Sequence, residues 1–145
     1  MTLKELFGDP ARRQDVVRDC CDLIDQEVKD KSGLSGIAIK AGYSVVNGVK
    51  PTFVRDTVDH LLDQFADRLD PIYQEAKSAG KPVAEHFVAN KGRVADALLA
   101  ITDERAKRSK MQAAVKTYEK LRGSAKANVE AAMPRLGALV AKHDR

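Results

Sequence analysis

Four of the nine glycines lie between Lys31 and Pro51, a density that is typical of loops that bind phosphate. A Walker-type loop needs a glycine, four further residues and then Gly-Lys-Ser/Thr, because its backbone N–H groups surround the phosphates. Here five residues separate Gly42 from Gly48, and Pro51 stands where the hydroxyl-bearing residue belongs. A dinucleotide fingerprint fails as well, since no strand is predicted before the glycines. The glycine-rich stretch therefore does not predict a nucleotide site.

The same stretch is better explained as a helix over 35–49 that begins at Ser35. Its apolar side chains are mostly small and cover a wide arc, which predicts close packing against neighbours on several sides. Gly42 lowers helix propensity by about 1 kcal/mol relative to Ala, so we expect another helix to approach closely there. We predict that 35–49 is the central, mostly buried helix, with Gly33 and Gly48 as its hinges. The alternative is an anion site at the N–H groups that follow Ser35.

A second grouping, on a helix predicted over 51–69, has residue types that bind cations. Asp56, His60, Asp63 and Asp67 recur at i, i+4, i+7 and i+11 and therefore share one helix face. That face lies opposite the apolar positions, whereas carboxylate metal sites in bundles project inward from several helices. We interpret it as a solvated acidic face and predict no metal ion and no cofactor.

The other histidines and the cysteines show no catalytic pattern. His86 lacks an HExxH spacing, and His143 belongs to a tail that we expect to fray. Cys20 and Cys21 are adjacent, whereas a redox pair typically has two residues between its cysteines. We expect Cys20 to be a small core residue and Cys21 to flank the same face. No Gly-x-Ser-x-Gly motif occurs, and we predict that the protein is not an enzyme.

Charge is distributed unevenly along the chain. Residues 1–70 hold 10 Lys and Arg against 13 Asp and Glu, whereas residues 71–145 hold 15 against 8. The excess is concentrated in a basic segment over 105–126, whose only acid is Glu119. Its basic residues are Arg105, Lys107, Arg108, Lys110, Lys116, Lys120, Arg122 and Lys126. Nucleic-acid phosphates, an anionic membrane surface, the acidic half of this or another copy, or water and salt could compensate these charges.

Nucleic acid is not the partner that the basic segment favours. It has a single aromatic residue, Tyr118, whose spacing with Met111 and Leu121 places it on the core side, so no platform for stacking bases is predicted. Trp and Phe are missing from its apolar face, which argues against membrane insertion. Weak, sequence-nonspecific binding of nucleic acid through this segment is kept as an alternative.

The elements that position these residues are all predicted to be helices. Besides 35–49 and 51–69, apolar periodicity and the Pro and Gly positions predict helices over 10–30, 71–80, 82–89, 94–107, 111–123 and from 124 onward, with a kink or break at Pro134. The predicted fold is all-α: a compact bundle or irregular array of seven to eight helices without a sheet, in a single domain over 1–145. No leader and no apolar stretch of roughly 20 residues is found, so we expect a cytoplasmic protein.

Several segments resemble small bacterial proteins of unknown function. They are Lys31-Ser-Gly-Leu-Ser-Gly36 with Lys40-Ala-Gly-Tyr43, Ala97-Leu-Leu-Ala-Ile-Thr-Asp103, and Pro134-Arg-Leu-Gly-Ala138. The resemblance extends over most of the chain and implies a helical domain without implying an activity. We therefore expect a binding or scaffolding module that acts through a protein–protein surface, as a monomer or a homo-oligomer. A small-ligand-binding helical domain, with a pocket lined by 35–49, is a further alternative.

Overall fold

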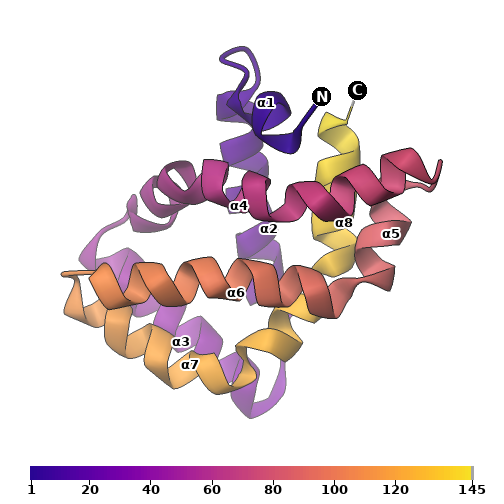
Figure 1. The fold of residues 1–145 in the computed structure, drawn as a ribbon. Helices are drawn as coiled ribbons and strands as arrows, with labels where there is room; N and C mark the ends of the chain where they lie inside the picture. The colour runs from indigo at the N-terminus through magenta and orange to yellow at the C-terminus, as the bar shows by residue number, and fades with distance from the viewer. Residues whose placement is uncertain (145) are drawn as a thin grey trace.

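The computed structural model describes residues 1–144 and shows eight helices joined by short connections (Figure 1). The helices are α1 (Leu3–Gly8), α2 (Arg13–Asp30), α3 (Gly33–Val49), α4 (Phe53–Ser78), α5 (Val83–Ala89), α6 (Lys91–Arg108), α7 (Gln112–Ala131) and α8 (Met133–His143). The described residues form no strand, so the all-α prediction with seven to eight helices is confirmed. None of the described helices has an apolar stretch long enough to cross a membrane.

The hydrophobic core lies where α4 passes across α2 and α8 (Figure 1). Its buried side chains come from α1, α2, α4, α5, α6 and α8, and they include the fully buried Phe87 on α5. Helices α5 and α8 pack closely, because a Cβ at Gly137 would lie 2.9 Å from the Ala84 carbonyl oxygen. In contrast, α3 contributes nothing to this core and α7 contributes only the partly buried Val129.

The N-terminal helix α1 was not predicted from the sequence. Thr2 caps it by accepting a hydrogen bond from the Glu5 N–H at 3.1 Å. Its apolar residues Leu3, Leu6 and Phe7 are all buried in the core. Six residues are too few to show a helical period, which explains the omission.

The prediction that Asp70 and Pro71 start a new helix is wrong, because α4 continues through both. Proline inside a helix removes one backbone hydrogen bond and costs roughly 3 kcal/mol. Burial of the adjacent Ile72 and Tyr73 offsets this loss, since both are at most 3% exposed. The Asp70 carboxylate instead accepts from the backbone N–H of Leu3 at 3.0 Å and thereby holds α1 against α4.

The last predicted boundaries are partly wrong. Gly123 does not end a helix, since α7 continues to Ala131 while packing between α6 and α3. The break predicted at Pro134 is confirmed, because α8 begins at Met133 with the proline in its first turn.

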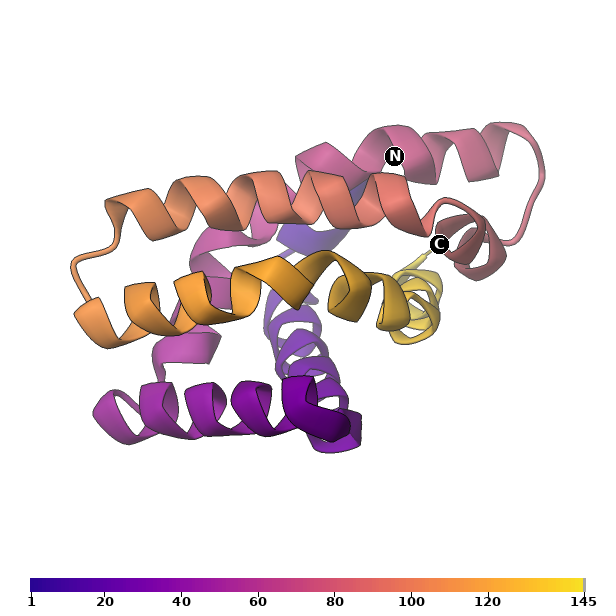
Figure 2. The same ribbon diagram turned by 90° about the horizontal axis from the view of Figure 1, so that it is seen from below.

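The largest correction concerns the glycine-rich stretch. It is helical, as predicted, but α3 is an outer helix and not the central one. In Figure 2 the helices α6, α7 and α3 form three successive layers, with α3 at the outside. Only Gly36 and Val46 of its 17 residues are buried, because α4 occupies the centre that was assigned to this helix.

Candidate interaction surface

The outward face of α3 is an apolar stripe. Leu34, Ile37, Val45 and Val49 are 87%, 67%, 52% and 61% exposed, and at 100° per residue they point to the same side of the helix. Ala38, Ala41 and Gly48 are exposed between them. We call these seven residues the α3 stripe.

The opposite face of α3 holds the helix against the molecule. Val46 is buried there, and the Tyr43 hydroxyl donates a hydrogen bond to the Asp25 carboxylate on α2. Burial and this hydrogen bond together raise the pKa of Tyr43 to about 12. The side chain therefore stays neutral at any physiological pH and ties α3 to α2.

Two glycines explain why α3 begins where it does and lies so close to α7. Gly33 has φ +71°, a left-handed conformation that side chains rarely adopt. At Gly42 a Cβ would lie 2.5 Å from Thr117 Cγ2 on α7, so the predicted close approach of another helix is confirmed. Nothing lies within 4 Å of such a Cβ at Gly48, and the structure shows no packing reason for that glycine.

The α3 stripe stands out because charge and polar groups are nearly missing from it. Lys40 is the only charged residue of α3, and it lies on the flank of the stripe. The described residues include six exposed large apolar side chains, and four of them belong to this one helix. Isolated exposed apolar residues are ordinary, but a contiguous apolar face is typical of an interaction site.

The residues of the basic segment have very different surroundings. Arg122 Nε lies 2.8 Å from the Asp103 carboxylate, and Lys126 Nζ lies 3.1 Å from that of Asp96. The bonds from Arg122 lower the pKa of Asp103. Other members are Lys107 and Arg108, each 3.8 Å from Glu104, and Lys110, Lys116 and Lys120, which are exposed without an ion pair in the described part.

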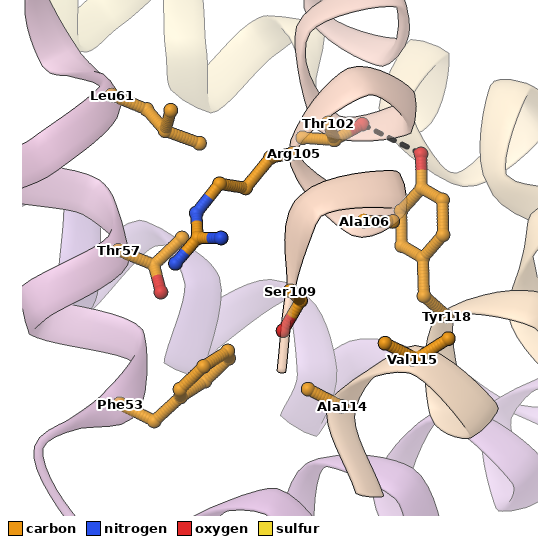
Figure 3. Close-up of a pocket in the computed structure, with 10 residues that line it drawn as sticks. All are labelled: Phe53, Thr57, Leu61, Thr102, Arg105, Ala106, Ser109, Ala114, Val115 and Tyr118. Atoms are coloured by element: carbon orange, nitrogen blue, oxygen red, sulfur yellow. Dashed lines mark hydrogen bonds between the residues drawn. The ribbon is translucent and has the colours of Figure 1, made fainter. Parts of the chain in front are cut away.

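Arg105 differs from the other seven, because it lines a cavity between α4, α6 and α7 (Figure 3). The eight residues therefore do not present their charges on one continuous surface. The sequence indicated the charge excess. It did not indicate which of these basic residues form ion pairs and which point into the protein.

Three acids of α2 pair with basic residues of α8. Arg135 lies 2.9 Å from Glu27, while Lys142 and His143 lie 2.9 Å and 2.7 Å from the Asp19 carboxylate. The expectation that His143 lies in a frayed tail is wrong: it is 7% exposed and packs edge-on against Phe7. Its position in the last turn of α8 brings it between α1 and α2. These contacts could not be predicted, because Phe7 and Asp19 are far from His143 in the sequence.

A model of the family of unknown function DUF6918 matches residues 3–144. The chain belongs to this family. Its resemblance to proteins of unknown function is thereby confirmed. Comparisons with curated proteins and with solved structures give no match.

The remaining groupings of this DUF6918 chain are surface ion pairs. Asp63 and Asp67 pair with Arg13 and Lys4, and no group of three or more His, Cys, Asp and Glu residues within 1–144 is arranged to hold a metal ion. On α5, His86 lies 3.1 Å from Glu75. Glu75 also accepts two hydrogen bonds from Arg93, and these, with His86, lower its pKa to about 2. These contacts form a local network of ion pairs, and the α3 stripe is the candidate interaction surface.

Proposed function

We propose that this protein is a non-enzymatic helical binding module, built as a single domain, whose working surface is the α3 stripe. The occupant that we propose for the stripe is a second copy of the same chain. The observation that carries the proposal is the contiguous exposure of apolar side chains along α3. Burying apolar surface is the main driving force of protein association, at roughly 25 cal/mol per Å².

A second copy fits the stripe for two physical reasons. First, an apolar helix face needs an apolar partner, and the surface in the described part that best matches the α3 stripe is another α3 stripe. Second, a symmetric interface places the same surface of both copies face to face, which is unfavourable when that surface carries charges of one sign. The stripe itself carries no charge, and the small side chains Ala38, Ala41 and Gly48 allow the two helices to approach closely.

The expected dimer is a weak one. A helix of 17 residues is about 25 Å long, so the interface lies at the small end of specific interfaces. We expect a dissociation constant of roughly 1–100 μM. The free cysteines and the family resemblance favour the cytoplasm of a bacterium as the place of action.

Sedimentation equilibrium over a range of concentrations tests the proposal. We expect Ile37→Glu to abolish the dimer. A charged group in place of an interface anchor costs about 2 kcal/mol, and a symmetric dimer contains the change twice, so the dissociation constant should rise roughly 1000-fold.

The matched control is Val88→Glu, which adds the same charge at an exposed apolar residue on α5. This variant should associate like the wild-type protein. A wild-type chain that stays monomeric at several hundred micromolar, or equal loss of the dimer in both variants, would rule out the α3 stripe as the self-association surface. If the wild-type chain stays monomeric, liposome binding would test a membrane surface as the partner of the α3 stripe. Oligonucleotide binding would test nucleic acid as the partner of the basic segment.

A further inference from the structure

A cavity of about 130 Å³ lies between the first half of α4, the end of α6 and the start of α7 (Figure 3). Its walls are largely apolar, with Phe53 and Leu61 on α4 and Val115 on α7. A volume of this order accommodates a ring of about the size of benzene. The cavity is on a different part of the molecule from the α3 stripe, so a ligand there would be independent of the function proposed for that surface.

One charged side chain, that of Arg105 on α6, points into this apolar space (Figure 3). Its Nε atom is inaccessible to water and has no hydrogen-bond partner. The guanidinium also forms no ion pair with any carboxylate within residues 1–144, unlike those of Arg93, Arg122 and Arg135. An arginine stays protonated in proteins, so this charge is partly desolvated without compensation.

The nearest acids in sequence do not provide the missing partner. Asp103 accepts hydrogen bonds from Arg122 and from the Tyr118 hydroxyl. Glu104 is exposed and lies within ion-pair distance of Lys107 and Arg108. No carboxylate of the described chain therefore neutralises Arg105, and a bound anion or solvent must supply its counter-charge.

We propose that this cavity binds a small monocarboxylate with an apolar body, and that Arg105 holds its carboxylate. The planar guanidinium donates two parallel N–H groups to a carboxylate, which is the geometry that distinguishes arginine from lysine. The hydroxyl-bearing residues Thr57 and Ser109 lie on either side of the guanidinium and add possible donors (Figure 3). The apolar walls then enclose the rest of the ligand.

Amide chemical shifts recorded during a titration of the full chain with benzoate test this site. We expect saturable shifts in the segments that line the cavity, above all around residues 57, 105–109 and 115–118. Benzyl alcohol, which has the same ring without the charge, should bind at least tenfold more weakly. Arg105→Met should weaken benzoate binding at least tenfold, and Arg105→Lys should restore it only in part, because the ammonium lacks the planar pair of donors.

The matched control is Arg108→Met, which removes an exposed arginine one turn further along α6 and should leave benzoate binding unchanged. Benzoate shifts that are equal in the wild-type protein and Arg105→Met would overturn the proposal, as would shifts scattered over the surface without saturation. If Arg105→Met does not fold, the wild-type comparison decides alone, since equal affinity for benzoate and benzyl alcohol would show that the arginine binds no carboxylate.

Discussion

Asp19 on α2 links this helix to the C-terminal helix α8, because its carboxylate pairs with Lys142 and His143. Burial raises the pKa of this carboxyl group, but the hydrogen bonds from Lys142 and His143 outweigh it, and the pKa lies below its usual value. Because the folded pKa is depressed, the stability from this group is present above the unfolded pKa and is lost as the pH falls through the folded one.

We therefore expect Asp19→Asn to lower the free energy of unfolding by about 1.5–3 kcal/mol at pH 7, as for hydrogen bonds to charged groups. The difference from the wild-type protein should shrink from about pH 4 downward, where the unfolded carboxyl begins to take up its proton. Urea melts at pH 7 and at low pH measure it. Asp22→Asn, at an exposed position of the same helix, is the control and should stay within about 0.5 kcal/mol. A difference that does not depend on pH would contradict the assignment.

The two cysteines should react at different rates. Burial raises the pKa of Cys20 to about 12, with smaller contributions from Cys21 and Asp19, so almost no thiolate exists at pH 8. The pKa of Cys21 is raised as well, again mainly by burial. We expect a thiol reagent to modify Cys21 roughly ten times faster or more in the native state. The variants Cys20→Ser and Cys21→Ser assign each kinetic phase of labelling to one cysteine. Equally fast labelling of both would contradict the burial of Cys20.

At the scale of elements, periodicity predicted well where a helix has one apolar face against the core. Helix α2 has this pattern and was predicted to end at residue 30, where it does end. The pattern misleads where tertiary contacts override a local signal, as at Pro71 inside α4 and Gly123 inside α7. The pattern also predicted wrongly that α3 is the central helix. A helix that is apolar on nearly all sides is expected to be buried, but one side of α3 is exposed.

Gly42 tests the contact between α3 and α7. We expect Gly42→Leu to destabilise the protein by roughly 1–3 kcal/mol or more, because the β-branched Thr117 occupies the space that the side chain needs. Gly123→Ala is the contrasting change, since Gly123 is exposed in the interior of α7 with nothing near its Cβ position. That variant should gain about 0.5–1 kcal/mol from helix propensity. Denaturant melts compare the two, and a neutral Gly42→Leu would argue against the close packing.

For the whole molecule, the sequence indicated the fold class better than the position of the candidate surface. The basic segment drew attention because its charge excess is visible in composition, whereas the α3 stripe is visible only once α4 is known to fill the core. The inward position of Arg105 was equally hidden, since it depends on how α6 is rotated against α4 and α7. Both features come from packing between helices, which no single periodic pattern specifies.

The proposal of one domain predicts a single cooperative unfolding transition. Below the concentration at which the chain associates, far-ultraviolet circular dichroism and tyrosine fluorescence should give coincident urea curves. The core joins six of the eight helices of the described part, and α7 joins α3 to it, so no helix is expected to unfold separately. An early transition that removes α3 and α7 alone would show that these helices form a separate unit.

The most direct test of the central claim is an isotope-filtered NOE experiment on a mixture of labelled and unlabelled chains, which detects only contacts between two copies. If the α3 stripe is the interface, methyl groups of Leu34, Ile37, Val45 and Val49 should show NOEs to α3 of the other copy. These signals should disappear with Ile37→Glu and persist with Val88→Glu. Intermolecular NOEs that arise from other helices, with none from α3, would contradict the account.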